Sequence, residues 1–238
     1  MESSYLIHHY VELAAALAAS LYWLKTKEYK VRPFVWFLWL TIIVETIGLY
    51  PLFMQNNYDN TLFIFVKNSV FCRNTWLYNI YSSIGLILIG LFFLRNLQDQ
   101  TSKKIIKIIL VVCTAFAIIY YLTSGQFFIM SLPYDNALQT FAIFIFVLLY
   151  FRELMGSEEI LAFYKSHVFY ISVALLIWNI CLTPLFIFDG YYRAINTEFI
   201  AFRSTFLMIS NILLYSCYVF AFLISLYYKG KLVPKKLH

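Results

Sequence analysis

The sequence has little charge: 13% of its 238 residues are Asp, Glu, Lys or Arg, whereas 62% are hydrophobic. A soluble domain has about a quarter charged residues and roughly 45–50% apolar residues. The mean hydropathy of +0.75 therefore excludes a water-facing exterior, and it predicts an all-helical protein embedded in a lipid bilayer. The loops between the apolar runs are too short to hold a soluble catalytic domain.

The sequence also lacks the patterns that carry common chemistry. It has no GxSxG, HExxH, P-loop or paired-carboxylate motif, so we expect no enzyme activity, no cofactor and no metal site. The four cysteines form no CxxC pair, and we expect Cys113, Cys181 and Cys217 to be buried small hydrophobic residues. The net charge of +6 does not indicate nucleic acid, because the basic residues lie in short segments between apolar runs.

Seven apolar runs are each long enough to cross a bilayer core of roughly 30 Å. They predict transmembrane helices over residues 4–24, 34–54, 75–95, 104–123, 133–152, 166–188 and 203–228. Residues 1–238 are therefore expected to form one seven-helix transmembrane domain. In the longest loop, 55–74, residues 56–60 favour a turn. The apolar residues 62–71 fit either a segment along the membrane surface or a hairpin.

The distribution of basic residues predicts the orientation. Fourteen of the 18 Lys and Arg residues lie on one side, in the segments 25–32, 95–107, 152–165 and 229–236, and only Lys67, Arg73, Arg193 and Arg203 lie on the other. An excess of Lys and Arg marks the cytoplasmic side. We therefore expect the N-terminus outside and the C-terminus in the cytoplasm.

A short pattern recurs between the two halves of the chain. Residues 47–53 and 180–186 share Ile-x-Leu-x-Pro-Leu-Phe, and Asn79-Ile80 recurs as Asn211-Ile212. Parallel three-helix repeats over 1–97 and 133–230, joined by a linker helix over 104–123, would produce these offsets, as in some transporters. Coincidence in a chain built from few residue types explains the match equally well.

Polar side chains inside a bilayer are costly and are therefore candidates for function. In the predicted spans they fall in the outer half or near the midplane, and spacings of three and four group them on helix faces. The inner half, for example residues 142–149, has almost none. We expect an outward-facing polar pocket above an apolar plug, with these ligand-binding residues: Glu12, Glu45, Asn79, Asn136, Gln139, Asn179, Arg203 and Asn211.

Each candidate has a structural explanation beside the functional one. Glu45, the only acid deep within a span, suits a ligand counter-ion or proton site, or a hydrogen bond between helices. Arg203 suits an anion anchor or a side chain that reaches the interface. Glu12 lies near His8 and His9, which suits a solvated rim better than a metal site. The amide side chains either line the pocket or hold helices together.

Three features resemble uncharacterised small seven-helix membrane proteins of environmental bacteria, some encoded beside sensor histidine kinases. They are a basic inner segment over 25–32, Glu45 in the second span, and Asn56-Asn57 in the first outer loop. The resemblance implies a bacterial inner-membrane location and signalling through a sensor kinase or another membrane partner.

Two further resemblances concern architecture. In length, helix number and orientation the chain is similar to microbial rhodopsins, although residues 204–228 contain no lysine for a retinal Schiff base. Its three-plus-one-plus-three layout resembles that of SWEET and PQ-loop transporters, although the chain has no Pro-Gln pair.

These patterns favour a receptor-like or sensory protein that binds a small ligand from the outer side. Because the inner loops are short, it would have to signal through a separate partner. The first alternative is a small-solute transporter hinged at Pro51 and Pro184, and the second is a structural subunit of a membrane complex.

Overall fold

The computed structural model describes residues 2–56, 61–130, 133–192 and 197–232, and in these ranges every regular element is helical. The α-helices are α1 (Glu2–Thr26), α2 (Arg32–Gly48), α3 (Tyr50–Asn56), α4 (Thr61–Lys67), α5 (Thr75–Asn96), α6 (Gln100–Thr123), α7 (Pro133–Met155), α8 (His167–Tyr192) and α9 (Thr197–Leu232). Short 3-10 segments are η1 (Tyr29–Val31), η2 (Val70–Cys72) and η3 (Glu158–Lys165).

Six segments of the described chain are long and apolar enough to cross a membrane. They are Tyr29–Met54, Thr75–Asn96, Gln100–Thr123, Tyr134–Met155, His167–Leu185 and Ala201–Gly230. Their outward faces carry large apolar side chains, such as Val111 and Leu122 on α6, which would be unfavourable in water. This indicates a multi-pass membrane protein in a lipid bilayer.

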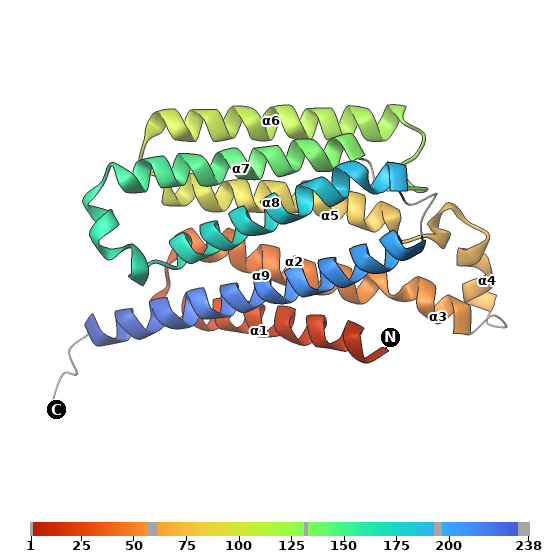
Figure 1. The fold of residues 1–238 in the computed structure, drawn as a ribbon, viewed down its shortest axis with the longest axis horizontal. Coiled ribbons are helices and arrows are strands. Elements are labelled where there is room, and N and C mark those ends of the chain that lie inside the picture. Colours follow the sequence, from red (N-terminus) through yellow and green to blue (C-terminus); the bar gives the residue numbers. More distant parts are fainter. Residues whose placement is uncertain (1, 57–60, 131–132, 193–196, 233–238) are drawn as a thin grey trace.

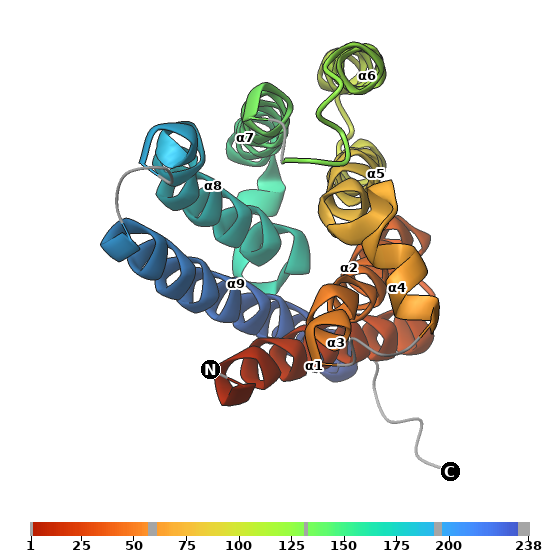
Figure 2. The ribbon, with the colours of Figure 1, turned by 90° about the vertical axis from the view of Figure 1, so that its right-hand side faces the viewer.

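Six long helices form a closed ring, and the seventh packs outside it (Figure 2). Around the ring each helix contacts the next in the order α1, α2, α5, α7, α8, α9 and back to α1. Within the described part of the chain helix α6 packs mainly against α5 and α7, and large apolar side chains such as Val111 and Leu122 are exposed on its outer face. The order around the ring is the same in both halves of the chain, while the sequence repeat itself stays a prediction.

The bundle has two distinct ends (Figure 1). One end contains the C-termini of α1, α5, α7 and α9 and most of the lysines and arginines, and we call it the basic end. The opposite end contains the start of α1 together with α3 and α4, and we call it the N-terminal end.

The predicted helix over 34–54 is broken at Leu49 into α2 and α3. Pro51 disfavours the helical conformation of the residue before it and cannot donate a helical hydrogen bond. The Leu52 N–H bonds to the Leu49 carbonyl, 2.9 Å away, instead of continuing the α-helical pattern to Gly48. The Gly48 carbonyl accepts a hydrogen bond from Asn74 Nδ2 at 2.7 Å, so α5 supplies the missing donor. Pro184, in contrast, lies inside a continuous α8.

Asn74→Ala is expected to destabilise this junction by about 1–2 kcal/mol, because it leaves a partly buried carbonyl without a donor. Thermal unfolding in detergent micelles measures the loss. The exposed Asn68, one short segment earlier, offers the same substitution as a control. An equal loss in Asn68→Ala would contradict the assigned role of Asn74.

Other details refine the sequence predictions. Most of the predicted turn over 56–60, namely residues 57–60, lies outside the described residues. The part of the loop that follows forms the short helix α4 and η2 rather than a strand hairpin. Cys113 is buried as expected, but the prediction was wrong for Cys181 and Cys217, which lie exposed on the outer faces of their helices. A helix spacing pattern alone does not determine which face meets lipid when both faces are apolar.

Candidate functional site

One face of α9 runs along the ring from one end to the other. Tyr215, Tyr218, Phe222, Ser225 and Lys229 follow one another at spacings of three and four residues, which aligns their side chains. All but Lys229 are buried. The stripe passes three features in turn: a pair of carboxyl groups, an aromatic layer and a pocket at the basic end.

The pair of carboxyl groups consists of Glu12 and Glu45. We use the name carboxylate cluster for these two residues together with the neighbouring tyrosines Tyr78, Tyr81 and Tyr215. The side chain of Glu12 on α1 is 2% exposed, and it lies close enough to Glu45 on α2 for the two charges to interact. Tyr78 on α5 donates a hydrogen bond of 2.9 Å to Glu45 Oε2. One carboxylate oxygen of Glu12 has no hydrogen-bond partner in the described structure.

Further hydroxyl groups complete this cluster. Tyr81 and Thr41 lie 2.9 Å apart through their hydroxyl oxygens, and Tyr215 on α9 lies beside both. Two nearby carboxylates in a medium of low dielectric repel each other strongly unless a proton or a cation is shared between them. Tyrosine rings also attract cations through their faces. The cluster therefore has the chemistry of a site for a proton or a small cation.

His8 and His9 lie beside the carboxylate cluster. His9 Nδ1 is 3.4 Å from Glu12 Oε2, and the rings of His8 and His9 pack with their centroids 4.5 Å apart. Both imidazoles are half-buried. No group of three metal-ligating side chains is found among the described residues.

Asn79 and Gln139 belong to a different cluster, which joins α5, α6 and α7. Asp135 Oδ2 accepts hydrogen bonds of 2.7 Å from both Tyr121 Oη and Gln139 Nε2. Asn79 Nδ2 donates to the Phe127 carbonyl at 2.8 Å, which anchors the turn after α6. These side chains largely satisfy one another, and such bonds hold helices together in a membrane.

Asn179 and Asn211 connect α8 with its neighbours. Asn211 Oδ1 accepts a hydrogen bond of 2.9 Å from Trp178 Nε1, which ties α9 to α8. Asn179 is 2% exposed and donates to the Leu175 carbonyl one turn back. With Thr140 and Pro184 it lines a mainly apolar groove of about 420 Å³ between α7 and α8.

The two remaining predicted ligand-binding residues, Asn136 and Arg203, are half-buried and lie in the half of the bundle nearer the N-terminal end. Asn136 lies on the turn of α7 that contains Asp135, and its carbonyl accepts a hydrogen bond of 2.8 Å from Thr140. Arg203 lies near the start of α9. The structure thus divides the predicted set: it brings Glu12 to Glu45, Asn79 to Gln139, and Asn211 to the residue before Asn179.

An aromatic layer closes the ring between the carboxylate cluster and the basic end. It consists of Phe34, Phe92, Tyr218 and Phe222, all with no exposed surface. The Phe34 ring centroid lies 5.0 Å from those of both Phe92 and Tyr218, and 6.1 Å from that of Phe222. Around it pack the apolar residues expected to form a plug, among them Ala142 and Phe146.

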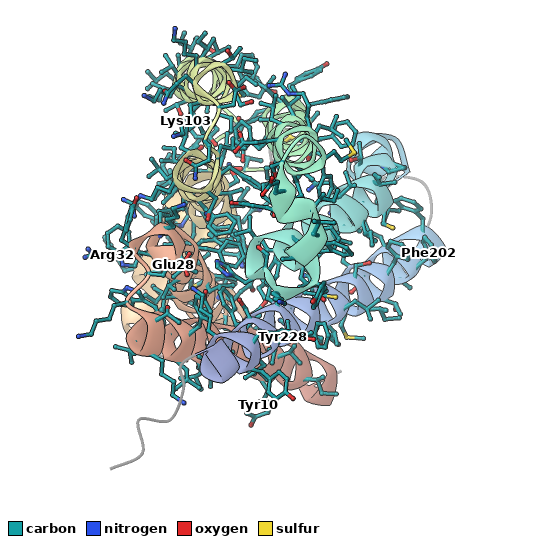
Figure 3. All side chains as sticks on the ribbon, turned by 90° about the vertical axis from the view of Figure 1, so that its left-hand side faces the viewer. Tyr10, Glu28, Arg32, Lys103, Phe202 and Tyr228 are labelled. Carbon is teal, nitrogen blue, oxygen red and sulfur yellow. The ribbon has the colours of Figure 1, made fainter. Side chains whose placement is uncertain are left out.

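Beyond the aromatic layer a pocket of about 310 Å³, with a mixed polar and apolar lining, lies at the basic end. Its walls come from α1, α5, α7, α8 and α9 and from the segments that contain η1 and η3. Glu28, labelled in Figure 3, accepts hydrogen bonds from Tyr22 Oη at 2.7 Å and from Lys229 Nζ. His167, at the start of α8, packs on Tyr22 with ring centroids 4.7 Å apart.

The charge state of Glu28 depends on this pairing. Burial alone raises the pKa of Glu28, but the hydrogen bonds from Lys229 and Tyr22 and the nearby His167 outweigh it and hold the pKa below its usual value. A second carboxylate at this end, Asp99, caps α6. Its pKa is lowered by hydrogen bonds from the Ser102 hydroxyl and from the Ser102 and Thr101 N–H groups. Asp99 also pairs with Arg152 of α7, at 2.8 Å.

Sequence reasoning missed the tyrosines and the basic-end pocket. Tyr78 and Tyr81 were not among the predicted site residues, although they lie next to Asn79 and Ser82 in the sequence of α5. His167, the second residue of the predicted span 166–188, was not among the predicted site residues either. An ionisable side chain in the first turn of an apolar run was the available signal.

No protein-family model matches the chain, and no similar curated protein or solved structure was found.

Proposed function

We propose that the protein is a receptor-like membrane protein that binds a small ligand with a cationic group at the carboxylate cluster. The observation that carries this proposal is the buried Glu12. Its Oε2 accepts no well-aligned hydrogen bond from the described residues, has His9 Nδ1 3.4 Å away, and lies near the second carboxylate of Glu45. An ammonium group between the two carboxylates would relieve their repulsion and contact the faces of the tyrosines.

The membrane topology is part of the proposal. Helix α1 has 25 residues, enough to cross the bilayer, and it belongs to the same ring as the other spans. Counting it gives seven spans, with the basic end in the cytoplasm by the distribution of Lys and Arg. The carboxylate cluster then lies in the outer half and receives its ligand from outside.

Signalling requires a change at the opposite end of the ring. The stripe on α9 links Tyr215 in the carboxylate cluster to Lys229 at the basic end, so a movement of α9 would affect both. A sensor kinase or another membrane partner at the basic end would detect that movement, because the loops there are too short to signal alone.

Ligand-dependent thermal stabilisation tests this function. In detergent micelles, tetramethylammonium or choline is expected to stabilise the protein, by about 2.7 kcal/mol at a concentration 100 times the dissociation constant. Glu12→Gln and Glu45→Gln should abolish the effect, because each removes one negative charge from the site. Glu158→Gln, an exposed carboxylate in η3, is the matched control.

Two outcomes would contradict the proposal. Stabilisation that persists unchanged in both Glu12→Gln and Glu45→Gln would place the ligand elsewhere. If no small organic cation stabilised the protein, the proposal that its ligand has a cationic group would be wrong.

A small-solute transporter is a second candidate, favoured by the position of the basic-end pocket. The pocket and the carboxylate cluster lie on opposite sides of the aromatic layer and along the same face of α9. An opening of that layer would join them into one path. Pro51, where the helix already breaks, and Pro184 are the predicted hinges.

A further inference from the structure

The basic-end pocket has the properties of a second binding site, distinct from the carboxylate cluster and independent of the function proposed above. It lies beyond the aromatic layer and has a volume of about 310 Å³, enough for a small organic molecule. Polar and apolar side chains share its lining.

His167 supplies an unused hydrogen-bonding atom at the base of this pocket. Its side chain is packed between Tyr22 and Phe222, with ring centroids 4.7 Å and 5.7 Å away, and the residue is 4% exposed. Its Nδ1 lies 3.5 Å from the Ser225 hydroxyl, whereas its Nε2 is buried without any partner in the described structure. Buried polar atoms in proteins almost always have a partner, so this nitrogen is left for a bound molecule.

The charges around the pocket favour an anion. Glu28 is already paired with Lys229, which leaves Lys30 and Lys165 against the single carboxylate of Glu159. The ammonium group of Lys165, one of the lining residues, lies 5.3 Å from the ring centre of Tyr164.

The start of α8 makes the electrostatic potential in the pocket more positive. Ser166, His167 and Val168 line the pocket, so the first turn of a 26-residue helix borders it. The N–H groups at a helix N-terminus attract negative charge. The N–H groups belong to the backbone of this turn and the unpartnered nitrogen belongs to the His167 side chain, so the two features are independent of each other.

The apolar part of the lining favours an anion with an organic body. Tyr150, Leu154 and Phe163 form part of the wall, and a bare inorganic ion would leave these surfaces uncovered. No arginine is among the lining residues in the described part of the chain, and arginine is the side chain best suited to phosphate. We propose that the basic-end pocket binds a small organic carboxylate, held by His167 Nε2 and by Lys30 and Lys165.

Histidine-selective NMR tests the proposal on the whole protein in detergent micelles, because the chain contains only four histidines. Protein with isotope-labelled histidine would be titrated with sodium benzoate and sodium succinate at constant ionic strength, and His167→Asn would assign the signal. At least one carboxylate is expected to shift the His167 resonances saturably. Sodium chloride and the uncharged benzyl alcohol should not.

Paired lysine variants give the matched control. Lys165→Gln should weaken binding about tenfold, since it removes one charged partner of the carboxylate. Lys104→Gln, on the exposed face of α6 at the same end, should leave binding unchanged. No saturable shift with either carboxylate up to tens of millimolar, or a shift with sodium phosphate alone, would overturn the assignment. Neither result depends on cation binding at Glu12 and Glu45.

Discussion

Replacing Lys229 with methionine is expected to reverse the way in which thermal stability depends on acid pH. In the native protein the pKa of Glu28 lies below its ordinary value of 4.5, because the Lys229 and Tyr22 hydrogen bonds outweigh the effect of burial. A lowered pKa stabilises the folded state above pH 4.5, and this contribution disappears as the pH falls through the folded-state pKa.

Without Lys229, burial would dominate and raise the pKa of Glu28 above that ordinary value. The carboxyl group would then destabilise the fold progressively as the pH rises through its new pKa, so that Lys229→Met is least impaired in acid. At neutral pH we expect a loss on the order of 2 kcal/mol, below the value for a fully buried pair. Unfolding temperatures between pH 4 and pH 8 measure the effect, with the exposed Lys25→Met as control. Parallel pH profiles for the two variants would show that Glu28 does not depend on Lys229.

Phe34→Ala is expected to cause the largest loss of stability, about 3–5 kcal/mol. Phe34 has no exposed surface and contacts rings from α5 and α9, so its removal opens a cavity at the centre of the ring. The free energy of unfolding in detergent micelles measures the loss. Phe65→Ala on α4, where the ring is 76% exposed, should change stability by less than about 1 kcal/mol.

Phe34→Ala also distinguishes the receptor function from the transporter function. If the aromatic layer is a permanent seal, proteoliposomes of the native protein should not accumulate small cations. If the native protein takes up small cations and the rate of uptake changes in Phe34→Ala, the transporter function is favoured. A receptor should show ligand-dependent stabilisation without any uptake.

The helices themselves were predictable from the sequence because a membrane span must be long and apolar. The run 75–95 corresponds to α5 (Thr75–Asn96), and the run 104–123 falls within α6 (Gln100–Thr123). The break at Leu49 was harder to predict, because Pro51 and Pro184 look alike in the sequence. What differs is the neighbour: Asn74 of α5 supplies a donor to the Gly48 carbonyl, and sequence periodicity does not reveal which helices touch.

The same limit applies to the candidate site. Helical spacing identified Glu12 and Glu45 correctly as polar groups on their helices, but only the ring order shows that they meet. The sequence placed Asn79 and Gln139 among the pocket residues but did not reveal their partners, which are the Phe127 carbonyl for Asn79 and Asp135 for Gln139. The basic-end pocket depends on chain segments that are far apart in the sequence, such as Glu28 and Lys229, and no local pattern joins them.

Helix α9 is much longer than the bilayer is thick. Its 36 residues extend about 54 Å at 1.5 Å per residue, against a hydrocarbon core of roughly 30 Å. The apolar part of this helix, Ala201–Gly230, has 30 residues and is itself longer than the hydrocarbon core. Tilting relieves such a hydrophobic mismatch, and α9 crosses the other helices obliquely in Figure 1. A change in bilayer thickness would alter that tilt and shift Lys229 relative to Glu28, which directly precedes η1. From the length of this one helix we therefore expect the ion pair at the basic end to respond to the thickness of the surrounding membrane.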